Sequence, residues 1–246
     1  MAQKIVDLLP DDADTYVEPF AGSLAVLLRK QPHKFEVVND LDGRIVSFWR
    51  TLRDKPEELA EALRLTPYAR DEFEHALATI DDTKDEVEYA RKVYVILRMS
   101  RRRTTSGSVS DFRGAGGPPQ PAYTYRRSVD AIAQVAERLR GVIVENTDAI
   151  SLVRRWDKRN VAMYLDPPYV GETRTERNYT VENAGIAFHQ SLVNTVNQMS
   201  AKILISGYDH PIYEGLHGWR KIEFKSRTGS SSETTRYATE VLWANY

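Results

Sequence analysis

The sequence has 246 residues, of which 41% are hydrophobic and 28% are charged. This length suits one or two domains, and the ordinary globular composition excludes wholesale disorder. The net charge of −1 excludes a globally basic nucleic-acid binder but leaves room for a local basic patch. Cysteine is absent, which excludes disulfides, thiolate nucleophiles and cysteine-ligated zinc.

The sequence also contains no signal for a membrane segment, for secretion or for a metal site. No apolar run approaches the roughly 18 residues of a membrane helix, and the first nine residues lack the apolar core of a signal peptide. The five histidines include no His-x-x-x-His pair, so we expect no metal site. The sequence therefore predicts a cytoplasmic protein without membrane contact.

Helix and strand signals alternate at both ends of the chain, as is typical of an α/β domain with a parallel sheet. The N-terminal part predicts a helix over 3–9, a strand over 16–18, a helix over 24–30, a strand over 35–38 and a helix over about 42–53. The C-terminal part predicts strands over 142–145, 161–165 and 202–206, with helices over 148–156, about 186–199 and 211–216. Two final strands near 219–226 and 239–245 predict an antiparallel hairpin at the edge of that sheet.

The middle of the chain differs in pattern. Residues 56–101 and 128–139 favour helix, whereas 104–125 have the glycine, serine and proline content of a loop. We therefore expect a helical insert over 54–140, with one α/β domain formed by 1–53 and 141–246.

Positive charge is concentrated in this insert. Residues 98–127 hold seven arginines and one acid, a net charge of +6 that leaves −7 on the other 216 residues. Such a run can be a solvated face or a phosphate-binding surface. The use of arginine, the loop context and the neighbouring Phe112, Tyr123 and Tyr125 favour nucleic acid. The candidate DNA-binding residues are Arg98, Arg101, Arg102, Arg103, Arg113, Arg126 and Arg127.

Two signals near the N-terminus are typical of a nucleotide-type site. The segment Glu18–Ser23 lies between a strand and a helix, where small residues let the backbone approach a ligand. A tight strand–helix turn explains this segment equally well. Asp40 follows the next strand, 18 residues after Gly22, where α/β folds hold ribose hydroxyls. A helix N-cap is the alternative for Asp40.

The third signal is Asp166-Pro167-Pro168-Tyr169, directly after an apolar strand. Two prolines fix the backbone and remove two amide donors. A carboxylate and a carbonyl can then both accept from one amino group, with an aromatic ring beside them. This arrangement suits the exocyclic amino group of a planar base. A simple Pro-Pro turn requires neither the acid before it nor the tyrosine after it.

In this order, the three motifs resemble those of the Dam-like (alpha, D12) N6-adenine DNA methyltransferases. The resemblance continues through Leu204–Asp209 and in the last strand, 240–246. It implies a Rossmann-like methyltransferase fold that binds S-adenosyl-L-methionine (AdoMet), with a mostly parallel sheet and an antiparallel C-terminal hairpin. The helical insert would then recognise double-stranded DNA.

The resemblance also implies a role for each motif residue. The turn would face the methionine part of AdoMet, Asp40 the ribose and Asp148 the adenine. Asp166 and the Pro167 carbonyl would accept from the target amino group, and Tyr169 would stack on the flipped base. The implied cofactor-binding residues are Glu18, Pro19, Phe20, Ala21, Gly22, Ser23, Asp40, Asp148 and Asp166. The implied catalytic residues are Asp166, Pro167, Pro168 and Tyr169.

The expected reaction is direct in-line methyl transfer to N6 of adenine after base flipping, without a metal or a covalent enzyme intermediate. Two alternatives stay open at this point: an RNA or cytosine-N4 amino methyltransferase, and a catalytically degenerate relative that binds DNA or cofactor. A monomer is favoured slightly. A restriction–modification pair, phage protection and host regulation would all use the same enzyme.

The sequence departs from the family pattern in two places. Family members carry a Gly-Gly-Lys segment several residues before the position of Lys4, and the sequence does not contain it. We expect either a natural start further upstream or one cofactor contact fewer. The insert also lacks the family's Phe-Asn-Gly pattern and is rich in arginine over Met99–Arg113. No recognition sequence is therefore transferred.

Overall fold

Short runs of β-branched and aromatic residues form the strands, because such side chains pack well on a pleated surface. The computed structural model describes residues 1–101, 112–114, 120–170, 185–230 and 235–246. Its strands are β1 (Thr15–Glu18), β2 (Phe35–Asn39), β3 (Val142–Glu145), β4 (Val161–Leu165), β5 (Lys202–Tyr208), β6 (Arg220–Ser230) and β7 (Thr235–Ala244). The predicted strands at 142–145 and 161–165 agree with β3 and β4 at both ends.

The described residues fall into two units by their contacts. An α/β unit contains Met1–Leu41 and the described residues from Thr147 onward, and a helical unit contains Asp42–Asn146. The sequence placed the start of the insert at residue 54, after the helix that the structure shows as α2 (Gly43–Asp54). In the structure α2 belongs to the helical unit, where it packs against α5 (Glu86–Met99).

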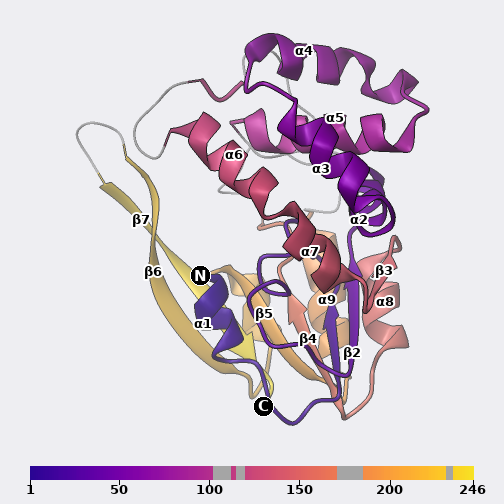
Figure 1. Cartoon of the computed structure of the whole chain (residues 1–246). Coiled ribbons are helices and arrows are strands. Elements are labelled where there is room, and N and C mark those ends of the chain that lie inside the picture. Colours follow the sequence, from indigo (N-terminus) through magenta and orange to yellow (C-terminus); the bar gives the residue numbers. More distant parts are fainter. Residues whose placement is uncertain (102–111, 115–119, 171–184, 231–234) are drawn as a thin grey trace. The chain divides into compact units, whose positions relative to one another are not determined.

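The strands of the α/β unit form one mixed sheet in the order β2-β1-β4-β5-β7-β6 (Figure 1). Parallel pairing joins β1 to β2 and β4, and β4 to β5. The last strand, β7, is antiparallel to both β5 and β6. This arrangement confirms the predicted α/β fold class, a mostly parallel sheet with an antiparallel C-terminal hairpin.

The two faces of this sheet differ in character because successive side chains point to opposite sides. One face is an apolar core in which Val17, Met163 and Ile203 pack against residues of the covering helices. Those helices are α8 (Ala149–Arg155), α9 (Ile186–Val196) and the 3-10 helix η4 (Pro211–Gly215). The opposite face carries polar side chains near the carboxyl ends of the strands and lies beside α1 (Ala2–Val6) (Figure 1).

The helical unit is built from short amphipathic helices with clear start signals. Asp42 caps α2 and Asp85 caps α5, each by accepting from a backbone N–H of the first turn. Proline opens two other helices, where its missing N–H costs nothing. The remaining helices are α3 (Pro56–Arg64), α4 (Arg70–Thr79), η1 (Ile80–Asp82), α6 (Pro121–Asp130) and α7 (Ile132–Leu139).

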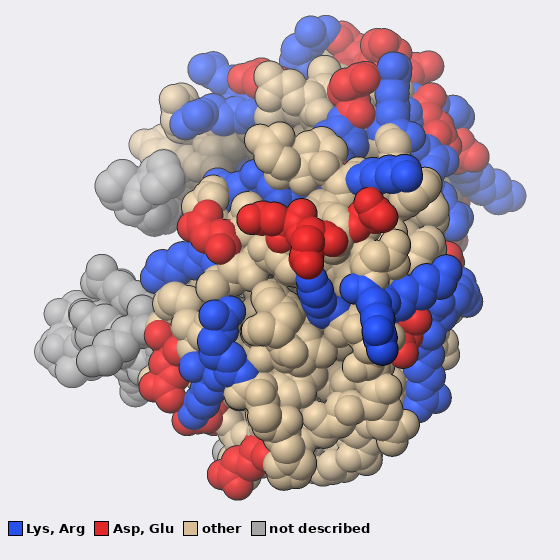
Figure 2. All heavy atoms as spheres, turned by 90° about the horizontal axis from the view of Figure 1, so that it is seen from below, with Lys and Arg blue, Asp and Glu red and all other residues tan. Residues whose placement is uncertain are grey.

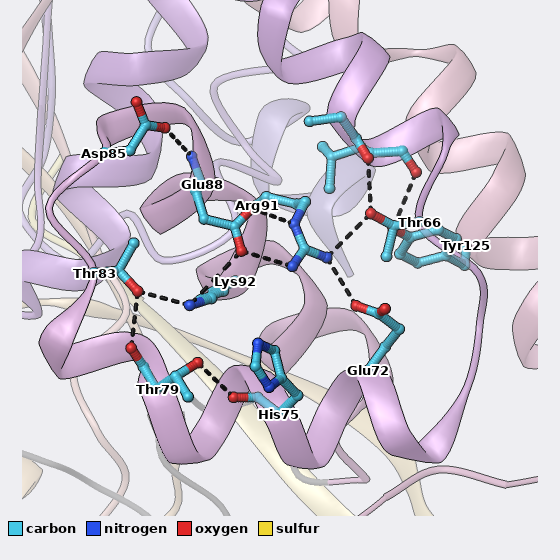
Figure 3. Close-up of polar contacts among 12 residues, drawn as sticks. Thr66, Glu72, His75, Thr79, Thr83, Asp85, Glu88, Arg91, Lys92 and Tyr125 are labelled. Atoms are coloured by element: carbon cyan, nitrogen blue, oxygen red, sulfur yellow. Dashed lines mark hydrogen bonds and ion pairs between the residues drawn. The ribbon is translucent and has the colours of Figure 1, made fainter.

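An arginine at the centre of the helical unit joins three of its elements (Figure 3). The guanidinium of Arg91 on α5 donates to both carboxylate oxygens of Glu88, at 2.6 and 2.8 Å. It also donates to Glu72 of α4 at 2.9 Å and to the hydroxyl of Thr66 at 3.2 Å. These bonds hold α5 against α4 and the segment that follows α3.

Two predictions of local structure are wrong. The helix predicted over 24–30 is a series of turns, because Gly22 and Leu24 both adopt positive φ, 46° and 59°, at its start. The loop predicted over 104–125 ends earlier than expected, since α6 begins at Pro121. Proline at the first helical position is favourable, so this residue starts the helix rather than extending the loop.

The surface shows charges of both signs. On the face seen in Figure 2, lysine and arginine side chains lie interspersed with aspartate and glutamate, in keeping with the net charge of −1. Among the described residues, none of the helices combines the length and the hydropathy that a membrane span requires.

Candidate active site

The turn after β1 is tied to the end of β2 by three hydrogen bonds. The N–H of Ala21 donates to the Asn39 carbonyl, and the Asn39 amide donates to the Pro19 carbonyl, both at 2.9 Å. The N–H of Gly22 donates to a carboxylate oxygen of Asp40, also at 2.9 Å. The pair Asn39-Asp40 therefore shapes the turn that precedes it in sequence by about 20 residues.

Backbone strain is concentrated in the same turn. Leu24 has a φ of 59°, a left-handed conformation that is rare for a branched side chain. Its side chain is almost completely buried, and its N–H donates to the Ala21 carbonyl at 2.7 Å. Strained residues of this kind persist where the surroundings dictate them and are common at ligand sites.

Glu18, the last residue of β1, is a buried carboxyl with an unusual environment. It is only 2% exposed and accepts a hydrogen bond from the Tyr16 hydroxyl at 2.9 Å. Burial raises the pKa of Glu18 to about 8, the Tyr16 bond opposes this rise and the nearby charge of Asp166 adds to it. The carboxyl is therefore mostly protonated at neutral pH until a cation approaches it.

Asp166 follows β4 directly and is held by a chain of hydroxyl groups. The Ser206 hydroxyl donates to a carboxylate oxygen of Asp166 at 2.7 Å, and the Tyr164 hydroxyl lies 3.0 Å from the Ser206 oxygen. Because the serine proton is directed to Asp166, Tyr164 is the donor to Ser206. Burial raises the pKa of Tyr164, so this hydroxyl keeps its proton. The chain fixes the direction of the carboxylate.

The aromatic member of the tetrapeptide also has a partner. The Tyr169 ring packs against Tyr208 at the end of β5, with the centroids 4.5 Å apart and the planes tilted by 57°. Pro167 is buried and Pro168 is partly buried. The tetrapeptide therefore presents one carboxylate and one aromatic ring toward the open face of the sheet.

The turn after β1 and the tetrapeptide after β4 line a single pocket on the polar face of the α/β unit. Its volume is about 180 Å³, whereas complete ligand sites usually have roughly 300–1,000 Å³. The pocket therefore has room for only part of a larger ligand. The structure thus brings together most of the predicted cofactor turn and the side chains of Asp166 and Tyr169 from the tetrapeptide. The lining includes Glu18, Phe20, Ala21, Gly22, Ser23, Tyr164, Asp166, Tyr169 and Ser206, with Met1, Ala2 and Ile5 around α1.

Three predicted cofactor residues lie outside this lining. The Pro19 carbonyl accepts from Asn39, and Asp40 accepts from Gly22, so both stabilise the turn. Asp148 is the N-cap of α8 and accepts from the N–H and the hydroxyl of Ser151 at 2.8 and 2.9 Å. The N-cap of α2 is Asp42, so Asp40 is not the capping residue of that helix.

Sequence reasoning did not select Tyr164, Ser206 or Tyr208 as site residues. A signal for Tyr164 exists, because it precedes Asp166 by two positions in a strand and therefore faces the same side. Ser206 and Tyr208 share that face of the neighbouring strand. They could be found only once the pairing of β4 with β5 was known.

The arginines of the helical unit are not equivalent. Arg98 is half-buried at the end of α5, within 3.5 Å of the Thr124 carbonyl, and the N–H of Arg113 donates to the Met99 carbonyl. Arg101, Arg126 and Arg127 are exposed. Arg102 and Arg103 lie outside the described residues.

The aromatic residues near these arginines divide in the same way. Phe112 packs against Tyr68 and Phe73, each with centroids 5.7 Å away, and Tyr125 is 5% exposed. Phe112 and Tyr125 are buried in the helical unit, so these two aromatic residues do not support the interpretation of the arginine-rich region as a nucleic-acid surface. Tyr123 is 53% exposed and lies under the Arg127 guanidinium at 5.9 Å.

The sequence of this chain is similar to those of known methyltransferases. Residues 1–229 match the model of the D12 class N6 adenine-specific DNA methyltransferases. The Type II methyltransferase M1.LlaDCHI of Lactococcus lactis subsp. cremoris is 26% identical over 260 residues, covering 97% of this chain and 89% of its own. The crystal structure of SMU.472, a putative methyltransferase complexed with SAH, aligns with a TM-score of 0.39 and 11% identity. That alignment covers 100% of this chain and 52% of the other.

Proposed function

The chain belongs to the D12 class of N6 adenine-specific DNA methyltransferases, and from this premise we propose how its site works. The proposal is transfer of a methyl group from AdoMet to N6 of an adenine that is flipped out of double-stranded DNA at a defined sequence. The observation that carries it is the single pocket lined by the turn after β1 and by the tetrapeptide after β4. One pocket can then hold both reacting groups.

The pocket residues fit the chemistry of AdoMet. When bound, AdoMet supplies a methyl group made electrophilic by a positively charged sulfur, and it also carries an amino group. The buried carboxyl of Glu18 lies in the pocket wall, and a cation brought beside it would favour its ionised form. Gly22 has open space where a side chain would stand, so the backbone can approach the ligand. We assign Glu18 and the turn Pro19–Ser23 to the methionine part of AdoMet.

The acids flanking the pocket would complete the cofactor site. Asp40 would meet the ribose and Asp148 the adenine of AdoMet, although each directs one carboxylate oxygen to a backbone N–H. These hydrogen bonds fix the orientation of both side chains before the ligand arrives. Such pre-organisation lowers the entropy that binding costs.

The tetrapeptide would prepare the target amino group. The carboxylate of Asp166 and the carbonyl of Pro167 would each accept a hydrogen bond from it, which would raise the electron density on the nitrogen. These two acceptors would hold the nitrogen in line with the methyl group that AdoMet supplies, and Tyr169 would stack on the base. The proton that the nitrogen loses on methylation would pass to the Asp166 carboxylate and from there to solvent. Flipping the base costs a few kcal/mol, which stacking and hydrogen bonds in the pocket offset. Catalysis rests on positioning and electrostatics.

Recognition of the duplex is assigned to the helical unit. Its exposed arginines Arg101, Arg126 and Arg127 can contact phosphates, and Tyr123 beside Arg127 offers an aromatic surface. Arg98 would act less directly because its guanidinium already lies near Thr124. Arg113 is partly buried, so it is less accessible than Arg101, Arg126 and Arg127. The arginines Arg102 and Arg103 complete the proposed set.

The test is methyl transfer from labelled AdoMet to unmethylated genomic DNA, followed by digestion to nucleosides and mass spectrometry. We expect the label in N6-methyldeoxyadenosine. Label in N4-methyldeoxycytidine, or in RNA but not in DNA, would assign a different amino group. A folded protein that binds DNA but transfers no label to either nucleic acid would contradict the proposed activity.

The same assay tests the catalytic carboxylate. We expect Asp166→Ala to lower the methylation rate by about 10²–10³-fold, because one acceptor of the transition state is lost. The matched control is Asp209→Ala, since Asp209 is exposed beyond the end of β5 and pairs with Lys221 at 2.9 Å. Near-normal methylation by Asp166→Ala would place the reaction elsewhere.

A further inference from the structure

A histidine that the proposed mechanism does not use lies behind the tetrapeptide. His189 of α9 is 0% exposed, and its Nδ1 lies 2.9 Å from the Tyr213 hydroxyl. Burial lowers the pKa of His189, whereas the nearby backbone of Pro168 raises it by a smaller amount. The ring is therefore neutral at physiological pH and lies close to the second proline of the tetrapeptide.

The partner of this histidine is itself held rigidly. The Tyr213 ring stacks on Trp243 of β7 with centroids 4.3 Å apart and planes at 26°. Its other contact is Gly207, where an added Cβ would stand 3.4 Å from the tyrosine ring and 3.2 Å from Trp243. Burial raises the pKa of Tyr213, so its hydroxyl keeps a proton to donate. Glycine at 207 thus leaves the space that this tyrosine needs.

The hydrogen bond from Tyr213 determines which nitrogen of the His189 ring carries the proton. A neutral imidazole carries one N–H, so when Tyr213 donates to Nδ1, the proton resides on Nε2. Nε2 of His189 is buried, and among the described residues no acceptor meets it at full hydrogen-bond geometry. A buried donor without a partner is unfavourable, which favours any state in which an acceptor reaches it.

The tetrapeptide offers such an acceptor at its second proline. Pro167 and Pro168 have no N–H, so their own backbone can form hydrogen bonds only through carbonyl groups. The Pro168 carbonyl shares a rigid peptide plane with the N–H of Tyr169. A donor at that carbonyl therefore fixes the plane from which the Tyr169 side chain projects.

We propose that His189 is a positioning residue, whose Nε2–H donates to the Pro168 carbonyl in the catalytic complex and so orients Tyr169 toward the target base. Hydrogen bonds of active sites are often long in the free protein and tighten when the ligands bind. The neighbouring residue supports a linking role for α9, because the Phe188 ring meets Phe20 of the cofactor turn edge-on at 6.1 Å. The inference rests on the proposed role of the tetrapeptide.

The test compares His189→Leu, His189→Gln and Tyr213→Phe in steady-state methylation of genomic DNA. We expect His189→Leu to lower kcat by about 10–100-fold, because a small displacement of a reacting group has effects of this size. The KM values for AdoMet and DNA should stay within about threefold. His189→Gln retains an N–H donor and should recover most of kcat, and Tyr213→Phe should fall between the two.

The matched control is Val193→Ala, a buried substitution one turn further along α9. We expect it to lower the thermal midpoint without changing kcat of the folded enzyme. The proposal is overturned if Val193→Ala lowers kcat as much as His189→Leu, or if His189→Leu is folded and fully active. Failure of the proposed function is distinguishable, because the wild type would then transfer no label, or Asp166→Ala would remain as active as the wild type.

Discussion

At the scale of single residues, the pocket contains two carboxyl groups whose environments differ sharply. Asp166 is exposed and accepts from Ser206, whereas Glu18 is buried and has a pKa raised to about 8 by that burial. Pairs of acids separated in this way commonly take different tasks. Asp166 already accepts one hydrogen bond, and Glu18 can gain a negative charge when a cation enters.

The raised pKa of Glu18 has a measurable effect on stability. Between its ordinary pKa of 4.5 and about 8, the folded state binds more protons than the unfolded state, so stability falls as pH rises through this window. We expect Glu18→Gln to remove this fall, so that its thermal midpoint exceeds that of the wild type at pH 8.5 by more than at pH 5. Scanning calorimetry at several pH values measures the difference.

The matched control for this prediction is Glu214→Gln, because Glu214 is exposed on η4. Its thermal midpoint should follow that of the wild type at every pH. If Glu18→Gln also runs parallel to the wild type over the whole range, Glu18 is ionised in the folded protein and the assigned protonation is wrong.

Candidate site residues can be found from the sequence where one motif contains the whole signal. Glu18, Gly22, Asp166 and Tyr169 stand in continuous motifs and line one pocket in the structure. Ser206 and His189 act through partners 40 and 24 residues away in sequence, Asp166 and Tyr213. No local pattern encodes such contacts, because they depend on strand pairing and on helix packing.

At the scale of elements, the buried strands were the most predictable. The five residues of β4 are all buried, and their unbroken apolar run marks both ends. The segment 24–30 was predicted as a helix because its residues have helical propensity, whereas the structure shows turns that begin at the positive φ of Gly22 and Leu24. The N–H of Gly22 donates to Asp40, which lies beyond β2. Tertiary contacts override propensity at this point.

Helix α6 allows the proposed DNA surface to be tested. Arg126 and Arg127 are exposed on it, and each phosphate contact contributes about −0.9 to the slope of log K against log salt. We expect the double variant R126A/R127A to weaken binding to duplex DNA and to reduce this slope by about two. Fluorescence anisotropy at several salt concentrations measures both quantities, and AdoMet affinity should not change.

The matched control for α6 is the double variant R64A/R140A in the same unit. Arg64 and Arg140 are also exposed and pair with Glu61 and Glu137 of their own helices. The variant R64A/R140A changes the net charge of the chain by the same amount as R126A/R127A. An equal loss of slope in this control would mean that general charge, rather than the surface of α6, determines DNA affinity.

At the scale of the whole molecule, the chain divides into an α/β unit that contains the pocket and a helical unit organised around Arg91. Each unit is compact by its own contacts, so we expect the two units to respond separately to perturbation. Arg91→Met should destabilise the helical unit by about 2–3 kcal/mol, because Glu72 and Glu88 lose their shared partner. AdoMet should stabilise the α/β unit by mass action.

Hydrogen exchange measured residue by residue can separate these two effects. In Arg91→Met, amide protection should fall over α4 and α5 and stay unchanged over β4 and β5. Saturating AdoMet should raise protection over β1 and β4 in both the wild type and the variant. The matched control is Arg53→Met, since Arg53 pairs only locally, with the neighbouring Asp54 on α2 at 2.7 Å. If Arg91→Met lowers protection equally in both units, they unfold as one cooperative structure, and the catalytic site then depends on the integrity of the helical unit.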